Sequence, residues 1–182
     1  ALGLALALLA LAGCKSSSGG GGAATPCNVD ADPTLVDWVA IPGGSYAMGE
    51  PEGGSWDERP LHDVELVGFE MTRTELTVAA YAACVTAGVC SEPASGGVGE
   101  CNWGHEDRQE HPVNCIDWAQ ARQACIWLGG RLPSESEWEW AARSAGSSPY
   151  PWGDAAPDCT RAVMAPTPDE PSCGQGPGTL PV

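Results

Sequence analysis

Apolar residues recur at helical spacing in three segments of the chain. In the first segment, Val78, Tyr81 and Val85 share one face, which is the pattern of a helix packed on a core. Thr77 can cap the start of this segment and Gly88 can end it. The pattern therefore predicts a helix between these two residues.

A second helix is predicted after Asp117, a residue type that accepts hydrogen bonds from the first N–H groups of a helix. The residues expected on its buried face are Trp118, Ala121, Cys125 and Leu128. Gly129 and Gly130 follow, and glycine is common just past a helix end.

A third helix is predicted from Ser134 to about Arg143. Ser134 and Glu137 have the spacing of a capping box, in which each side chain bonds the backbone N–H of the other residue. Pro133 keeps the preceding chain extended, and Gly146 marks the expected end.

Two strands are predicted, one over Val36–Ile41 and one over Val64–Glu70, where Val64, Leu66 and Gly68 alternate with their neighbours. The IPGGSYAMG segment between them requires the conformational freedom of glycine for a turn. With 24 glycines and 16 prolines, much of the remaining chain is expected to form turns and loops. Together these elements predict a fold rich in irregular loops.

The chain starts with an apolar run, ALGLALALLALAGC, that is too short for a mature membrane span and is typical of a secretory signal. Its end resembles the lipobox of bacterial lipoproteins, in which Cys14 would carry the lipid anchor; an ordinary signal peptide is the alternative. The KSSSGGGGAATP stretch that follows has the composition of a flexible linker. We predict a lipoprotein signal segment at 1–14, a linker at 15–35 and a domain at 36–182. The protein is expected to be exported and lipid-anchored in the bacterial cell envelope, in the periplasm or at the cell surface.

Eight cysteines remain when Cys14 is set aside, and an even number favours disulfides in an exported protein. They are Cys27, Cys84, Cys90, Cys101, Cys115, Cys125, Cys159 and Cys173. Short closures join Cys84 to Cys90 or Cys101, and Cys159 to Cys173, while the full pairing stays open. The sequence contains no C-x-x-C, which disfavours a zinc site.

Charge and motif content exclude several functions. The net charge is −16, which repels a phosphate backbone and disfavours nucleic-acid binding. The densest polar group is His105, Glu106, Asp107, Glu110 and His111. Its spacing differs from H-E-x-x-H, so a solvated acidic loop is favoured over a metal site. His62 is expected to be a structural strand residue. The sequence has no G-x-S-x-G, G-x-x-x-x-G-K-[ST] or strand-embedded G-x-G-x-x-G motif. These residues therefore predict no catalytic, cofactor-binding or metal-binding site.

Three segments resemble the sulfatase-modifying-factor family, whose best-known members are the formylglycine-generating enzymes. They are VAIPGGSYAMG (Val39–Gly49), RPLHDVELVGFEMTRTELTVAAYAAC (Arg59–Cys84) and HPVNCIDWAQARQACIWLGGRLPSESEWEWAARSAGSSPYPWGD (His111–Asp154). The GRLPSESEWEWAAR block in the last segment is the most specific part of the resemblance.

The resemblance implies a C-type-lectin-like α+β arrangement, with two central helices beside short antiparallel strands and long loops. It also implies oxidation of a cysteine in an unfolded sulfatase segment to formylglycine, with oxygen and a copper(I) ion held by two thiolates. In the family those cysteines follow G-x-x-D-M-x-G-N-V-W-E-W and R-G-G-S-W blocks, and neither block occurs here. Gly178–Val182 resembles the turn that leads into them, so the domain is expected to be truncated at its C-terminal half.

Two positions bear on other family features. Where family members commonly have an Ala-Asn pair whose asparagine binds a structural calcium, Ala162 is followed here by Val163. Cys125 falls in the family's A-Y-C-x-W pattern, where the resemblance implies a disulfide to the missing half and thus an unpaired thiol here. Copper and calcium are implied only if that half carries their ligands.

Three functional hypotheses follow. The first is a formylglycine-generating-oxidase-like domain that acts on an unfolded sulfatase or another protein, with the catalytic half absent. The alternative is a non-catalytic, envelope-anchored binding or structural module on the same fold. Iron-dependent carbon–sulfur bond formation ranks last, because the His-rich partner domain that usually accompanies it is lacking.

Overall fold

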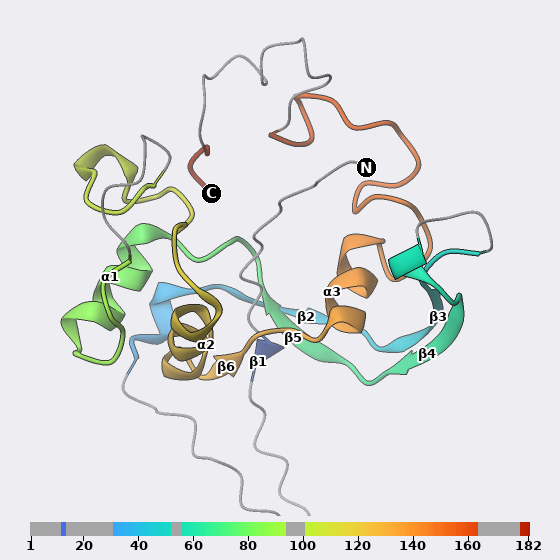
Figure 1. The fold of residues 1–182 in the computed structure, drawn as a ribbon, viewed down its shortest axis with the longest axis horizontal. Helices are drawn as coiled ribbons and strands as arrows, with labels where there is room; N and C mark the ends of the chain where they lie inside the picture. Colours follow the sequence, from blue (N-terminus) through green and yellow to red (C-terminus); the bar gives the residue numbers. More distant parts are fainter. Residues whose placement is uncertain (1–11, 14–30, 52–55, 94–100, 164–178) are drawn as a thin grey trace, which may run out of the picture. The chain divides into compact units, whose positions relative to one another are not determined.

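The computed structural model describes residues 12–13, 31–51, 56–93, 101–163 and 179–182 (Figure 1). The chain forms two compact units: the first comprises residues 1–39, 71–132 and 174–182, and the second comprises residues 40–70 and 133–173. Each unit has its own cluster of buried side chains. The structure is a small mixed α/β fold with short helices and sheets, which confirms the predicted α+β class.

Helices α1 (Val78–Thr86) and α2 (Trp118–Trp127) belong to the first unit. Thr77 Oγ1 accepts a hydrogen bond from Ala80 N at 3.1 Å and caps α1. Asp117 and Gln120 form a capping box at the start of α2. Both predicted helix starts are confirmed.

The prediction that Trp118 lies on the buried face of α2 is wrong, because its side chain is 70% exposed. Trp118 is the first residue of α2, and the buried residues of the helix begin one turn later, at Ala121. Cys125 and Leu128 are buried as predicted.

The core of the first unit consists of apolar side chains from α1, α2 and the segments beside them. Its buried members are Leu76, Val78, Ala80, Tyr81, Cys84, Cys90, Val113, Ala121, Ala124, Cys125, Trp127 and Leu128. Ala31 and Leu35 pack against this cluster, and Leu35 ends the one-turn 3-10 helix η1 (Pro33–Leu35). Packing therefore begins upstream of Val36, inside the segment that the sequence assigned to a linker.

A four-stranded sheet has the order β2-β5-β1-β6. Its strands are β2 (Trp38–Ile41), β5 (Phe69–Thr72), β1 (Ala12–Gly13) and β6 (Gly130–Arg131). β1 is antiparallel to both neighbours, with Ala12 opposite Met71 on β5 and Arg131 on β6. The strand predicted over Val36–Ile41 is present from Trp38.

The second unit contains an antiparallel pair, β3 (Gly44–Met48) and β4 (His62–Leu66), and helix α3 (Glu135–Ala142). The capping box of Ser134 and Glu137 is present as predicted. The single strand predicted over Val64–Glu70 is wrong: β4 ends at Leu66 and β5 starts at Phe69. Val67 and Gly68, between the two strands, are both exposed, so the alternation of inward and outward residues breaks at Gly68.

The core of the second unit is formed by Tyr46, Met48 and Trp140. The rings of Tyr46 and Trp140 lie 5.3 Å apart, and Trp140 Nε1 donates a hydrogen bond to Pro42 O at 2.9 Å. Gly44 lies against the Trp140 ring, where a larger residue would not fit, because a Cβ there would be 2.7 Å from Trp140 Cη2. Among the described helices, none combines the length and apolar character that a membrane span needs.

Candidate functional site

A depression of about 470 Å³ lies in the second unit, where β3, β4 and the first turns of α3 contribute to its wall. The one-turn helix η2 (Trp56–Glu58) also lines the depression, with Asp57 and Glu58. The apolar lining comes from Met48, Pro60 and Val64, the carboxylates from Asp57, Glu58, Glu135 and Glu139, and the nitrogen-bearing side chains from Arg59 and His62. This excess of carboxylates suits a cationic or neutral polar group better than an anion.

Glu139 links α3 to the end of β3 at this depression. Its Oε1 accepts hydrogen bonds from Gly49 N at 3.3 Å and from Arg143 Nη1 at 2.9 Å. Arg143 Nη1 also donates to Ala47 O at 3.3 Å. The carboxylate of Glu139 is therefore held in place by contacts within the protein.

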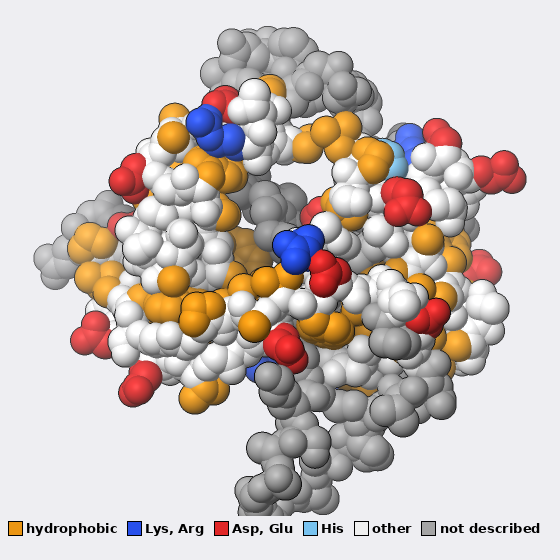
Figure 2. Space-filling view, turned by 180° about the vertical axis from the view of Figure 1, so that it is seen from behind, with side chains coloured by type: hydrophobic (Ala, Val, Ile, Leu, Met, Phe, Trp, Pro, Cys, Tyr) orange, Lys and Arg blue, Asp and Glu red, His pale blue; other side chains and the backbone are white. Residues whose placement is uncertain are grey.

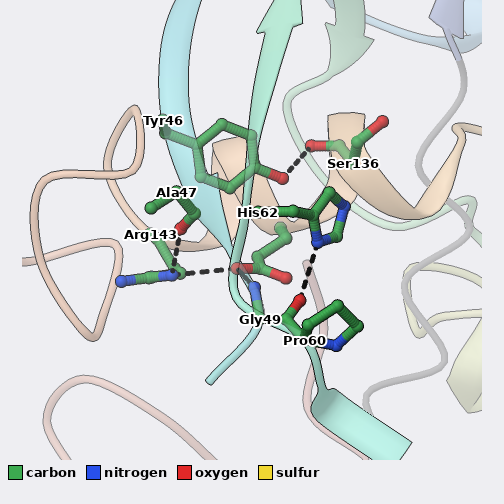
Figure 3. A network of polar contacts seen from close by, with 8 residues as sticks. Tyr46, Ala47, Gly49, Pro60, His62, Ser136 and Arg143 are labelled. Atoms are coloured by element: carbon green, nitrogen blue, oxygen red, sulfur yellow. Dashed lines mark hydrogen bonds and ion pairs between the residues drawn. The ribbon is translucent and has the colours of Figure 1, made fainter. Parts of the chain in front are cut away.

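Tyr46 is a neutral donor at physiological pH. Its hydroxyl donates to Ser136 O at 2.9 Å (Figure 3). Burial raises the pKa of Tyr46 to about 12, and the nearby Glu139 carboxylate adds to this effect while Arg143 opposes it. The hydroxyl thus anchors the first turn of α3 and does not act as a base.

His62 lies at the start of β4 and lines the depression, so the predicted strand position is confirmed. Its Nδ1 lies 2.8 Å from Pro60 O (Figure 3). A carbonyl oxygen only accepts hydrogen bonds, so Nδ1 carries the proton. In the neutral ring, Nε2 is therefore left as an acceptor.

The polar group between His105 and His111 belongs to the first unit. His105, Glu106, Asp107 and Glu110 are exposed, and the one-turn helix η3 (Glu106–Arg108) runs through the group. His111 is half-buried, with Nδ1 2.8 Å from Thr179 Oγ1. Across the described ranges, no group of three or more His, Cys, Asp or Glu side chains has the arrangement of a metal site.

Most of the described cysteines are oxidised. Disulfides join Cys84 to Cys90, one of the expected short closures, and Cys101 to Cys115, a pairing that the sequence did not single out. Cys159 is also disulfide-bonded, while Cys27 and Cys173 lie outside the described residues.

Cys125, another of the disulfide candidates, is instead a free thiol. It is fully buried, and burial raises the pKa of this thiol to about 12. A copper(I) site needs two thiolates, and the described part of the chain offers this single protonated thiol. The described residues therefore do not fit a copper(I) ion. Val163, at the position where the resemblance implied a calcium ligand, is 51% exposed and has no side-chain oxygen.

The depression could not be found from motifs, because its walls come from residues 48–64 and from residues 134–139. The available signal was the capping box, which fixes where α3 begins. Figure 2 shows acidic side chains scattered over the visible face and not gathered into one patch. The depression is thus a local concentration of carboxylates within a broadly acidic protein.

Comparison with known proteins gives a family match over residues 25–169, to the sulfatase-modifying factor enzyme 1-like domain. A formylglycine-generating enzyme of Streptomyces coelicolor is 30% identical over 157 residues, which cover 64% of this chain and 50% of that protein. A hercynine oxygenase of Mycolicibacterium smegmatis is 27% identical over 158 residues, 69% of this chain and 37% of that protein. An inactive C-alpha-formylglycine-generating enzyme 2 of Bos taurus is 46% identical over 52 residues, 28% of this chain and 17% of that protein. The chain spans about half the length of the first of these relatives.

Proposed function

This chain belongs to the sulfatase-modifying factor enzyme 1-like domain family, and from that premise we propose that the whole protein oxidises a peptidyl cysteine to formylglycine. The observation that carries the proposal is the family match over residues 25–169, together with the similarity to a formylglycine-generating enzyme. The described residues serve as scaffold in this proposal, because their free thiol, Cys125, is buried within the core. The two copper-binding thiolates come from outside the described residues.

The test is to co-express the full-length protein with a sulfatase and to analyse the sulfatase cysteine by mass spectrometry. The expected result is replacement of the thiol by an aldehyde, dependent on copper and oxygen. A matched variant, Cys125→Ala, should retain the conversion because this buried thiol is not a metal ligand. An unmodified cysteine beside a folded, copper-supplied protein would refute the oxidase proposal.

The second candidate is a non-catalytic binding or structural module on the same fold. It is favoured by the state of the described cysteines, which are disulfide-bonded or, for Cys125, buried and protonated. The similarity to a protein named inactive supports the same alternative. In this case the co-expression test gives no aldehyde, and the folded protein binds no copper(I) in equilibrium dialysis.

For the finer architecture, we propose a C-type-lectin-like arrangement. Helices α1 and α2 and the short antiparallel strands support it. The long stretches without regular structure agree with this architecture as well.

We also propose that the protein is exported and lipid-anchored through Cys14, a residue outside the described ranges. The disulfides Cys84–Cys90 and Cys101–Cys115 support export, since such bonds persist in oxidising compartments. Cleavage before Cys14 would remove β1 from its place between β5 and β6. Labelling of cells with radioactive palmitate should mark the natural protein and not Cys14→Ser, and equal labelling of both would contradict the anchor.

A further inference from the structure

The loop between Cys101 and Cys115 holds residues 179–182 in the first unit. Asn102 Nδ2 donates a hydrogen bond to Thr179 Oγ1 at 2.8 Å, and His111 Nδ1 lies 2.8 Å from the same hydroxyl. Val182 N donates to Glu110 O at 3.0 Å. All three contacts come from residues enclosed by one disulfide, so the shape of the loop determines whether the segment is held.

Asn102 takes part in most of the hydrogen bonds that organise this loop, and it is only 1% exposed. Its backbone N donates to Asn114 Oδ1 at 2.7 Å, and its Nδ2 also donates to Pro112 O at 2.8 Å. Arg108 Nη1 donates to Asn102 Oδ1 at 3.1 Å. Asn102 follows Cys101 and Asn114 precedes Cys115, so the disulfide fixes the spacing of the residues that hold Thr179.

The two disulfides of the first unit differ in their access to solvent. Cys84 and Cys90 are 0% and 7% exposed, whereas Cys101 is half-buried and Cys115 is exposed. Cys115 also has a backbone φ of 58°, a left-handed conformation that residues other than glycine rarely adopt. An exposed disulfide at a strained position is the one that an attacking thiolate reaches and opens first.

We propose that the Cys101–Cys115 disulfide is a redox-sensitive latch for the Thr179–Val182 segment. The reductant is a dithiol, such as the cysteine pair of a thiol–disulfide oxidoreductase. One thiolate of the pair attacks a latch sulfur and forms a mixed disulfide, which the second thiolate resolves. Cys101 and Cys115 gain two electrons and two protons in total, and the attacking dithiol becomes a disulfide. Opening frees the ends of the loop, and the contacts to Thr179 and Val182 are lost, while Cys84–Cys90 keeps the core closed.

The test treats the folded full-length protein with increasing concentrations of dithiothreitol and follows two observables. Alkylation and mass spectrometry should show Cys101 and Cys115 modified before Cys84 and Cys90. Hydrogen exchange at the Val182 amide should accelerate about tenfold in the same step, the size expected from losing one ordinary hydrogen bond. Prior opening of Cys84–Cys90, or unchanged exchange at Val182 once the latch is reduced, would overturn the proposal.

Variants separate the latch from a general loss of structure. Thr179→Val removes the hydroxyl contacts while leaving the disulfide intact, so Val182 should exchange faster without reductant. Thr160→Val, at an exposed threonine of the second unit, should leave Val182 exchange unchanged. If the double variant Cys101→Ser, Cys115→Ser folds, it should reproduce the reduced state, and protection of Val182 in that variant would refute the latch. If this double variant does not fold, the dithiothreitol titration of the natural protein tests the latch by itself.

Discussion

Cys125 shows how far burial alone changes a side chain. Its thiol lies in the core of the first unit, and the pKa of this thiol is raised to about 12. The protonated thiol behaves there as a small apolar group, since a buried thiol is only a weak hydrogen-bond donor. Its contribution to the protein is therefore packing.

Two substitutions of Cys125 test this packing role. Cys125→Ser should destabilise the protein by about 1–3 kcal/mol more than Cys125→Ala, because the serine hydroxyl would need a hydrogen-bond partner inside the core. Urea unfolding of the two variants measures the difference. Equal midpoints would show that the site offers a partner to a polar side chain.

The same thiol makes stability fall in alkaline solution. Its pKa is about 12 in the folded protein and 9.0 for a solvent-exposed thiol, so between these pH values the thiol ionises only in the unfolded chain. Its stabilisation is fully present below pH 9 and is lost as the pH rises toward 12. The free energy of unfolding should fall by up to roughly 1.4 kcal/mol per pH unit from this group.

Unfolding of the natural protein and Cys125→Ala at several pH values between 9 and 12 checks the assignment. The variant should have the shallower slope, although Tyr46, whose pKa is also raised, contributes to both proteins. Parallel slopes would mean that Cys125 is ionised in the folded state.

At the scale of elements, the turn before β3 depends on close approach of two backbones. A Cβ on Gly43 would lie 2.3 Å from Leu66 O and 2.6 Å from Gly68 N. Gly43→Ala should therefore destabilise the protein by about 1–3 kcal/mol, since Leu66 O belongs to β4 and Gly68 N to the short link between β4 and β5.

Gly68→Ala is the matched control in the same turn region. Its Cβ would be 3.4 Å from the nearest atom, Ile41 O, which is an ordinary contact. Thermal unfolding should show a clearly smaller loss than for Gly43→Ala. Equal losses would indicate that both glycines act through backbone flexibility.

Helices were more predictable from the sequence than strands. Thr77, Asp117 and Ser134 each bond N–H groups within their own first turn, so the signal for a helix start is local. Val67 alternates correctly with its neighbours, yet it marks the break between β4 and β5, because pairing is decided by distant strands. The depression was missed for the same reason: Met48 and Glu139 meet only after folding.

At the scale of the whole molecule, charge is the dominant general property. A net charge of −16 places many carboxylates on the surface, and their mutual repulsion opposes the folded state. The amount of charge was evident from the sequence, whereas its scattered arrangement in Figure 2 required the structure.

Raising the salt concentration should therefore stabilise the protein. Between 0.01 M and 0.15 M ionic strength the screening length falls from about 30 Å to about 8 Å. The melting temperature should rise by about 2–4 °C for each kcal/mol of repulsion removed. Calorimetry at pH 7 measures this shift, which should shrink near the isoelectric point of about 4.2. A melting temperature that falls with salt at pH 7 would show that attractive ion pairs dominate.

Trp140, described above for its contact with Tyr46, also gives the second unit a built-in optical probe. It is 5% exposed, whereas Trp56 in the same unit is 84% exposed. The first unit repeats this contrast, with Trp127 at 4% and Trp118 at 70%. Iodide in solution should quench the fluorescence of Trp56 and Trp118 and spare the two buried indoles. A variant in which Trp127 or Trp140 is the one remaining tryptophan would then report the unfolding of a single unit, through the shift of its fluorescence emission to longer wavelength.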